Sequence, residues 1–313
     1  MNKVLIADSV SSAVSEVFDK NGIAYDTKIG LSEDELATEI TEYSGLIVRS
    51  AVTVTEKIIN SASNLKVIGR PGVGVDNVDL KAATNNGIVV MNTPLGNVQA
   101  TAELTFGIMH SLMRKISNAN QSMHQKKWEK KKFIGNEMYG KTIGIIGFGN
   151  IGKKVSQIAH AYGMNVLVYS ASISPEDEKK FNVTNQSIDD ILEGADIITF
   201  HNKLSENSKY LINSNAITKM KKNAIIINCA RGGLVNEKDI KEALEKGNIA
   251  GYGCDVYENE PEQDSIFSSI DNVVMTPHIG ASTIEAQEKV AYQIAEQIVE
   301  FLKNNKIINQ VNK

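Results

Sequence analysis

Residues 141–170 read KTIGIIGFGNIGKKVSQIAHAYGMNVLVYS. A β-branched run over Thr142–Gly147 leads into a glycine pattern, a helical pattern follows, and a second strand pattern begins at Asn165. These spacings are those of a complete strand–helix–strand unit with parallel strands. The stretch therefore predicts a doubly wound α/β fold.

The glycines of this stretch, Gly147-Phe-Gly149-Asn-Ile-Gly152, stand where the strand meets the helix. Gly147 permits the tight turn, Gly149 lets the backbone approach a pyrophosphate, and Gly152 allows the helix to pack closely on the strand. The free N–H groups and the positive end of the helix attract phosphate. We expect a dinucleotide to bind here, and an ordinary glycine-rich turn is the alternative.

The same alternation of strand and helix patterns runs along the whole chain and predicts two parallel sheets. A first set of strands is expected at Lys3–Ala7, Gly45–Val48, Lys66–Gly69 and Ile88–Met91. A second set is expected at Thr142–Gly147, Asn165–Tyr169, Asp196–Phe200, Ala224–Asn228, Ala250–Cys254 and Val273–Thr276. Helices are expected at Val10–Lys20, at Glu33–Thr41 with Ser32 as N-cap, at Ala100–Lys115 and at Thr283–Lys303.

These elements suggest two Rossmann-like α/β domains with a cleft between them. We expect a flavodoxin-like substrate domain over residues 1–96, completed by the last helix over 284–313. A doubly wound dinucleotide-binding domain is expected over residues 97–283. At 313 residues the chain has the length of about two domains.

Composition narrows the class of protein. With 42% hydrophobic and 22% charged residues, the chain is neither disordered nor membrane-spanning. A net charge of −4 gives no general basic field, so we expect neither nucleic acid nor a membrane as a partner. The basic run Lys126–Lys132 is interpreted as a solvated face whose tryptophan, Trp128, is a packed anchor. Buried thiols at Cys229 and Cys254 and a strand beginning at Lys3 favour a cytoplasmic protein without a signal peptide.

Three reactive side chains follow three consecutive strands of the second set. Arg231 follows the run ending at Asn228, Glu260 follows the run ending at Cys254, and His278 follows Val273–Thr276. Ligands bind outside the carboxyl ends of the strands in open α/β sheets. Each residue alone has an ordinary structural explanation, but together they indicate an active site beside the phosphate loop.

The three residue types suit hydride transfer from a 2-hydroxy acid. The planar guanidinium of Arg231 can grip a carboxylate and the C2 oxygen, with the Gly232-Gly233 pair letting backbone amides approach. An imidazole such as His278 can take the hydroxyl proton near neutral pH. A carboxylate such as Glu260 can orient the imidazole and favour its charged form. We expect no metal ion in this site.

The first set of strands carries further polar groups at its carboxyl ends. Arg49 and Ser50 follow one strand; Arg70, Gly72, Val73 and Gly74 follow the next, and Asn97 lies near the turn between the domains. A lone substrate carboxylate does not need Arg49 and Arg70 in addition to Arg231. The two extra arginines therefore suggest a phosphorylated acid as substrate. Ion pairs across a domain interface are the alternative.

Motifs over nearly the whole chain resemble the D-isomer-specific 2-hydroxyacid dehydrogenase family. They are GLIVRS at 45–50, GRPGVGVDNVD at 69–79, MNTPLGN at 91–97, AELT at 102–105, GFGNIG at 147–152, NCARGG at 228–233, GCDV at 253–256, EP at 260–261 and PHIGAST at 277–283. The resemblance implies two Rossmann-like domains, NAD as cofactor, a small 2-hydroxy or 2-keto acid as substrate and a homodimer or higher homo-oligomer.

The resemblance also implies roles for single residues. Arg231 would bind substrate, Glu260 would partner the histidine, and His278 would be the acid/base. The cofactor would be bound by the following residues: Gly147, Gly149, Asn150, Ile151, Gly152, Ser170, Asn202, Cys229, Ala230, Asp255, Gly280 and Ala281. The substrate would be bound by Arg49, Ser50, Arg70, Gly72, Val73, Gly74 and Asn97.

The chain departs from the family pattern in three places. Ser170 stands where a ribose-binding Asp is usual, and His201-Asn202-Lys203 replaces His-Thr-Pro. We therefore hypothesise that NADP is tolerated beside NAD. Longer members carry C-terminal regulatory domains; because the sequence stops at Lys313, we expect no serine feedback through such a domain.

Two alternatives remain open. A glyoxylate/hydroxypyruvate reductase shares the catalytic set and differs only in the substrate pocket. A corepressor-like protein that senses dinucleotides belongs to another class and would carry added partner-binding segments. Formate dehydrogenases carry Gln at the position of Glu260 and are discounted.

Overall fold

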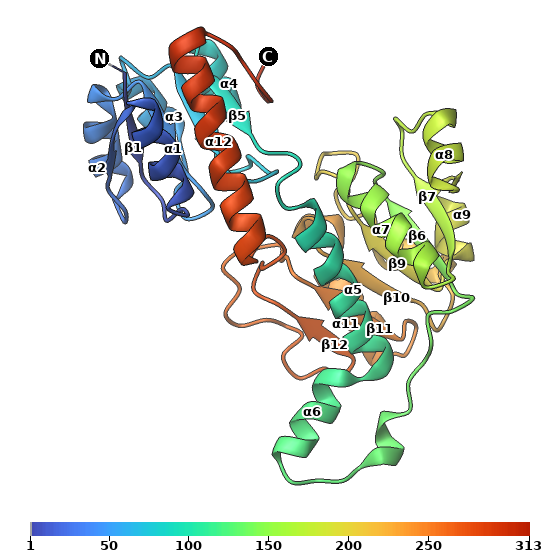
Figure 1. Cartoon of the computed structure of the whole chain (residues 1–313). Helices are drawn as coiled ribbons and strands as arrows, with labels where there is room; N and C mark the ends of the chain where they lie inside the picture. The colour runs from blue at the N-terminus through green and yellow to red at the C-terminus, as the bar shows by residue number, and fades with distance from the viewer. Residues whose placement is uncertain (1) are drawn as a thin grey trace. The chain divides into compact units, whose positions relative to one another are not determined.

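The computed structural model describes residues 2–313. The chain divides into two compact units (Figure 1): unit 1 comprises the residues up to Val98 together with Ala281–Lys313, and unit 2 comprises Gln99–Gly280. Within the described part of the chain, none of the helices has the length and apolar character needed to cross a bilayer.

Unit 1 is built on a five-stranded parallel sheet in the order β2-β1-β3-β4-β5. This is the flavodoxin-like order, which confirms the expected fold class of this part. Its strands are β1 (Lys3–Ile6), β2 (Ala24–Thr27), β3 (Gly45–Ile47), β4 (Val67–Arg70) and β5 (Val89–Asn92). The sequence did not indicate β2, because this edge strand reads AYDT and has no buried residue.

Helices cover both faces of this sheet. They are α1 (Ala13–Asn21), α2 (Glu33–Glu39) with the 3-10 turn η1 (Ile40–Glu42), α3 (Glu56–Ser61), α4 (Leu80–Asn85) and α12 (Ile284–Asn304). Ser32 begins α2 with a capping box, as predicted: its side chain accepts from the Glu35 N–H, and the Glu35 carboxylate accepts from the Ser32 N–H. Alternate residues of β1 separate the two cores, since Leu5 packs toward α2 while Val4 and Ile6 pack toward α1 and α12.

The last helix returns to the first sheet, as the sequence indicated. Thr283 caps α12 by accepting from the Ala286 N–H, and α12 runs along α1 (Figure 1). A Cβ on Gly69 of β4 would lie 2.8 Å from Ile294 and 2.7 Å from Ile298. Only glycine therefore lets α12 pack this closely on the sheet.

Unit 2 is built on a seven-stranded parallel sheet in the order β12-β11-β10-β9-β6-β7-β8. This is the doubly wound Rossmann order with one extra strand at an edge. The strands are β6 (Thr142–Ile146), β7 (Asn165–Tyr169), β8 (Thr184–Asn185), β9 (Ile197–Phe200), β10 (Ile225–Asn228), β11 (Gly251–Cys254) and β12 (Val273–Met275). The fold class is confirmed for this part as well; the two exposed residues of β8 gave no strand pattern.

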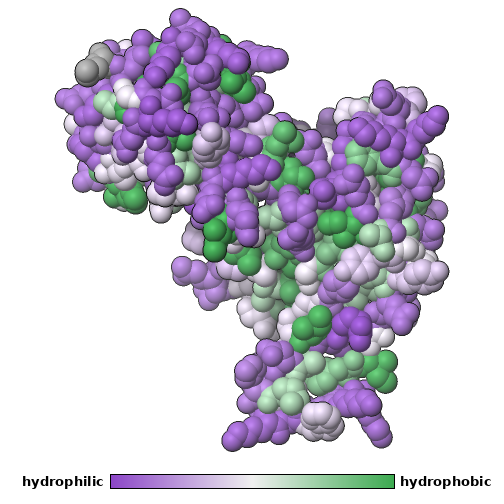
Figure 2. All heavy atoms as spheres, in the orientation of Figure 1, coloured by the Kyte–Doolittle hydropathy of each residue, from purple (hydrophilic) through white to green (hydrophobic). Residues whose placement is uncertain are grey.

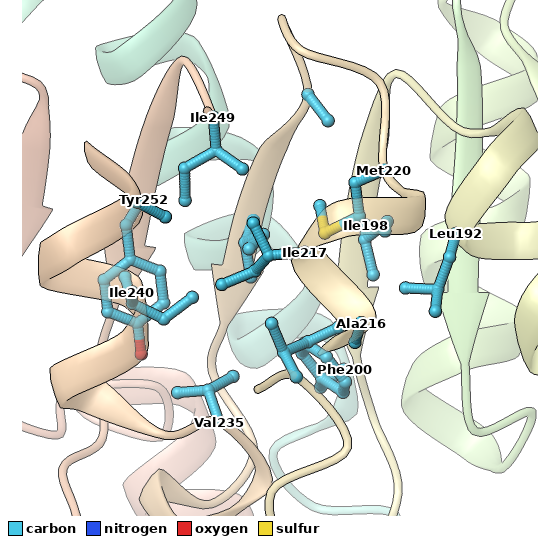
Figure 3. Packing of buried hydrophobic residues seen from close by; sticks show 14 of the residues in the cluster. Leu192, Ile198, Phe200, Ala216, Ile217, Met220, Val235, Ile240, Ile249 and Tyr252 are labelled. Carbon is cyan, nitrogen blue, oxygen red and sulfur yellow. The ribbon is translucent and has the colours of Figure 1, made fainter. Parts of the chain in front are cut away.

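Helices again cover both faces of the sheet. They are α5 (Val98–Arg114), α7 (Asn150–Ala161), α8 (Pro175–Phe181), α9 (Ile188–Gly194), α10 (Ser214–Lys219) and α11 (Glu237–Glu245), with the 3-10 turn η3 (Gly232–Leu234). The helix α6 (Ile116–His124) and the 3-10 turn η2 (Lys130–Phe133) follow α5 and lie away from the sheet (Figure 1). On one face, Leu192 of α9, Ile217 of α10 and Ile240 of α11 pack with Ile198 and Tyr252 of the sheet (Figure 3). On the other face, the apolar side of α5 and α7 packs against β6, β9 and β10.

One expectation about unit 2 was wrong. Trp128 is 82% exposed and is not a packed anchor within the chain. It lies between α6 and η2, in a segment whose exposed apolar side chains include Ile116, Met123 and Ile134. We call residues 116–134 the arm; Figure 2 shows its apolar surface in green among polar atoms at the bottom of the view.

Candidate active site

The glycine loop has the conformation that its sequence predicted. Gly147 adopts φ +99°, and a Cβ there would lie 2.5 Å from the backbone nitrogen of Asn202. A Cβ on Gly152 would overlap the carbonyl oxygen of Gly147. Side chains are therefore excluded at both positions, and the first turn of α7 packs directly on the end of β6.

The loop fits a pyrophosphate. Gly149 is the N-cap of α7, no side chain caps this helix, and no atom lies within 4 Å of the position that a Cβ on Gly149 would take. The N–H groups of the first turn, those of Asn150 and Ile151 included, thus belong to a helix end that a phosphate can approach. Both residues are exposed or partly exposed.

The position expected to meet the adenosine ribose carries no carboxylate. Ser170 directly follows β7, and its N–H donates to the Asn185 side chain at 3.2 Å. After β9, which β6 separates from β7, burial lowers the pKa of His201 to about 3, so the ring is neutral. The side-chain oxygen of Asn202 is buried and accepts no hydrogen bond within the described chain, although its amide donates to Lys203. A ligand hydroxyl can satisfy this acceptor.

Three neighbouring strands position the three candidate catalytic residues. Arg231 follows β10, Glu260 follows β11 and His278 follows β12, and these strands lie side by side in parallel. The glycine loop follows β6, which β9 separates from β10. The sheet therefore brings all of these groups to its carboxyl edge.

Glu260 and His278 form a hydrogen-bonded pair. The Nδ1 atom of His278 lies 2.5 Å from Oε2 of Glu260, and the other carboxylate oxygen accepts from the Tyr257 N–H at 3.0 Å. Burial raises the pKa of Glu260, but the hydrogen bond and charge of His278, together with the Tyr257 N–H and the Arg231 charge, outweigh it and leave this pKa below its usual value. The carboxylate is thus ionised, Nδ1 donates to it, and Nε2 is left to exchange a proton with a ligand.

The loop that carries His278 is fixed in an uncommon conformation. His278 has φ +53°, and its N–H donates to the Thr276 carbonyl at 3.1 Å. The buried Asp255 carboxylate accepts from the Thr276 hydroxyl at 2.6 Å and from the N–H groups of Ile279 and Gly280 at 2.7 and 2.8 Å. These three bonds lower the pKa of Asp255, but burial has the larger effect and leaves this pKa above its usual value. A backbone held outside the common regions is typical of functional sites.

The remaining cofactor candidates surround this loop or follow β10. Cys229 is buried, and burial raises the pKa of its thiol to about 12, which favours the protonated form. The carbonyl of Ala230 accepts from the Arg231 guanidinium at 2.6 Å. The Gly280 carbonyl accepts from the Thr101 hydroxyl, and Ala281 is the first residue of the chain's return to unit 1.

In unit 1, the Arg49 loop is organised by a residue that the sequence did not single out. Asp8 is buried after β1, and one oxygen of its carboxylate accepts from the N–H groups of Arg49 and Ala51, each at 3.0 Å. The Arg49 guanidinium donates to the Ser9 carbonyl, while Ser50 is exposed. A signal was present, because a carboxylate directly after a buried strand lies at the carboxyl edge.

The Arg70 loop depends on Gly72. Gly72 adopts φ +145°, and a Cβ there would overlap the Arg70 guanidinium, so the close approach of this group requires glycine. The Gly72 N–H donates to the Thr93 hydroxyl at 2.7 Å. Unit 1 thus holds two arginines at the carboxyl edge of its sheet, with the other substrate candidates, Val73, Gly74 and Asn97, partly exposed in the adjoining turns.

A family model described as D-isomer specific 2-hydroxyacid dehydrogenase, NAD binding domain, matches residues 106–280. The chain belongs to this dehydrogenase family. Unit 2 accordingly contains the NAD-binding domain of the family, and NAD is the cofactor that its glycine loop fits.

Relatives and solved structures agree with this assignment. The D-3-phosphoglycerate dehydrogenase of Bacillus subtilis (strain 168) is 42% identical over 314 residues, which are 100% of this chain and 59% of that protein. The TT0316 protein of Thermus thermophilus superposes with a TM-score of 0.91 at 30% identity, covering 99% of both chains. The NAD+-bound 3-phosphoglycerate dehydrogenase of Entamoeba histolytica gives 0.85 at 28% identity, covering 100% of this chain and 99% of its own. The chain thus spans about three fifths of the length of the bacterial relative.

Proposed function

We propose that the chain catalyses NAD-dependent oxidation of a phosphorylated D-2-hydroxy acid, 3-phosphoglycerate, to its 2-keto acid, 3-phosphohydroxypyruvate, the step that begins serine synthesis. The Glu260–His278 pair beside Arg231 supports the reaction type, because it joins an acid/base to an anion-binding group at the edge that carries the glycine loop. The name of the bacterial relative supports the substrate.

The glycine loop and the N-terminus of α7 would hold NAD, which would supply the acceptor for the hydride of the substrate C2. His278 takes the hydroxyl proton on Nε2 while Nδ1 remains bonded to Glu260, whose charge stabilises the imidazolium that forms. Arg231 orients the substrate carboxylate and holds charge on the C2 oxygen through its two parallel donors. For reduction of the keto acid, the same imidazolium returns the proton.

We propose that unit 1 is the substrate domain, with the boundaries 1–96 and 284–313, and that residues 97–283 form the cofactor domain. Arg49 and Arg70 would bind the substrate phosphate, and two guanidinium groups suit its two negative charges. Their placement at the carboxyl edge of the unit 1 sheet supports this role.

The test is a substrate panel followed by the absorbance of reduced nicotinamide. The band should appear with 3-phosphoglycerate and NAD or NADP, and its disappearance is followed with glyoxylate or hydroxypyruvate and the reduced form of either cofactor. Replacing Arg49 and Arg70 together with Ala should raise KM for 3-phosphoglycerate about a hundredfold or more, since each of the two lost charged contacts costs about 1.5–3 kcal/mol. KM for glyoxylate, which has no phosphate, should change less than twofold. Equal losses for both substrates would remove the phosphate assignment and favour a glyoxylate/hydroxypyruvate reductase; binding of NAD without any turnover would favour a dinucleotide-sensing protein.

We propose that NADP is tolerated as a second cofactor. Ser170 presents no carboxylate to repel a 2′-phosphate, and Lys203 supplies an exposed cation after β9. In the panel, kcat/KM for the two cofactors should differ less than about a hundredfold, or about 2.7 kcal/mol. A larger preference for NAD would refute this tolerance.

We propose a cytoplasmic homodimer that buries the arm. Trp128, Ile134 and Met123 expose apolar surface on the arm, and its run Lys126–Lys132 carries a net positive charge on a chain whose total charge is −4. A second copy offers the apolar area of its own arm, and its net negative charge favours approach of the basic run. Light scattering should give about twice 34.1 kDa, and Trp128→Glu with Ile134→Glu should give the monomer mass. A wild-type monomer would contradict the proposal.

A further inference from the structure

Tyr257 occupies the point where the three catalytic loops meet. It lies three residues after β11, and its ring packs partly buried against the apolar core under the sheet. Tyr257 lies between the motifs at 253–256 and 260–261 and belongs to neither. Three separate contacts nevertheless connect it with the loops of Arg231, Glu260 and His278.

The first contact is with the glutamate. The Tyr257 N–H donates to Oε1 of Glu260 at 3.0 Å, while Oε2 of the same carboxylate lies 2.5 Å from His278 Nδ1. The carboxylate is therefore held from both sides, and its plane is fixed relative to the imidazole. This bond also lowers the pKa of Glu260.

The second contact is with the histidine loop. The Tyr257 hydroxyl donates to the Thr276 carbonyl at 3.0 Å, and this same carbonyl accepts from the His278 N–H at 3.1 Å. The phenol thus anchors the acceptor that closes the turn in which His278 has φ +53°. Loss of the phenol would remove one bond from this turn, while the Asp255 carboxylate and the bond from the Thr276 N–H to the Cys254 carbonyl would remain.

The third contact is with the arginine loop. A Cβ on Gly232, the residue after Arg231, would overlap the carbonyl of Tyr257 and the nitrogen of Glu258. The turn after β10 therefore packs backbone against backbone on Tyr257. A displacement of Tyr257 would change the spacing of Arg231 from the Glu260–His278 pair.

We propose that Tyr257 is a positioning residue for the dehydrogenase reaction, acting through the Glu260–His278 pair. The proposal rests on the proposed function, because its effect is measured as turnover. Its phenol sets the histidine turn, and its backbone N–H sets the glutamate. The side chain can be altered by one atom with Tyr257→Phe, which keeps the packed ring and removes only the hydroxyl donor.

Tyr257→Phe should lower kcat for hydroxy acid oxidation about three- to tenfold, the effect of one lost hydrogen bond on a reacting geometry. KM for NAD and the thermal midpoint should remain close to wild type. The pH of half-maximal kcat should move downward by about half a unit, because a looser pair stabilises the imidazolium less and the neutral base then persists at lower pH. A purely structural residue would not move this pH profile.

Tyr210→Phe is the matched control. The Tyr210 hydroxyl donates to Glu258 at 2.9 Å, so the variant loosens the same loop by the same chemical change without touching Thr276. We expect kcat and the pH profile of this variant to match wild type. If Tyr257→Phe behaves like Tyr210→Phe, the proposal is wrong.

A double-mutant cycle with Glu260→Gln separates action through the pair from a general effect. Glu260→Gln alone should move the pH of half-maximal kcat downward by about one unit, since the imidazolium loses its charged partner. Adding Tyr257→Phe to it should lower kcat by less than about twofold, because the pair on which Tyr257 acts is already broken. Additive losses would overturn the proposal. A wild-type chain that turns over no 2-hydroxy acid would instead contradict the proposed function.

Discussion

Replacing His278 with Ala should lower kcat for 2-hydroxy acid oxidation by about 10²–10⁴-fold, the usual contribution of a positioned acid/base. His278 Nδ1 is bonded to the Glu260 carboxylate, and a methyl side chain can neither take the hydroxyl proton nor hold the charge that develops. The measurement is single-turnover formation of reduced nicotinamide, which reports the chemical step without product release.

Cofactor affinity is the internal control for this variant. The His278 side chain bonds Glu260, whereas the glycine loop and the N-terminus of α7 would hold the cofactor's pyrophosphate, so fluorescence titration with reduced nicotinamide cofactor should give an unchanged Kd. The His278→Asn variant should be equally slow, because an amide preserves a hydrogen bond to Glu260 but cannot titrate. A near-normal kcat in either variant would remove His278 from proton transfer.

Most of the fold could be predicted from the sequence because parallel strands buried on both faces are continuous apolar runs. Runs such as Asn165–Tyr169 and Ala224–Asn228 therefore gave strand positions within one residue of β7 and β10. The edge strands β2 and β8 could not be predicted, because their exposed polar residues have neither alternation nor an apolar run. The exposure of Trp128 could not be predicted either, because the sequence does not show whether a single apolar residue is covered by its own chain.

The residues of the site also fall into those that the sequence predicts and those that it does not. Residues at the ends of parallel strands could be assigned to one edge from strand order alone, and the Glu260–His278 hydrogen bond lies there. The supporting contacts of Asp8, Thr276 and Tyr257 could not be predicted, since they depend on the paths of loops and on atomic distances. The side chains that react are read from residue type, whereas those that hold them in place require coordinates.

The second large effect is expected from Arg231. Replacement with Ala should lower kcat/KM for the hydroxy acid by roughly 10²–10³-fold, because truncating one partner of a close charge pair costs about 2–5 kcal/mol. Arg231 is half-buried, its backbone carbonyl accepts from the Asn228 side chain, and its guanidinium already donates to the Ala230 carbonyl, so the side chain is held in place before substrate arrives. Because the side chain is already held in place, its contacts with the substrate contribute more binding free energy than those of a mobile surface arginine.

Arg231→Lys distinguishes charge from geometry in this position. Lysine keeps the positive charge but loses the two parallel donors that match a carboxylate. We expect kcat/KM of Arg231→Lys to be about tenfold higher than that of Arg231→Ala and still below that of the wild type. The remaining loss should be seen in kcat as well as in KM. A full recovery would mean that Arg231 acts as a charge alone. If kcat/KM of Arg231→Ala equals that of the wild type, other residues bind the substrate carboxylate. Arg231 would then not be the group that holds the acid beside His278, and the proposed reaction at this edge of the sheet would lose its support.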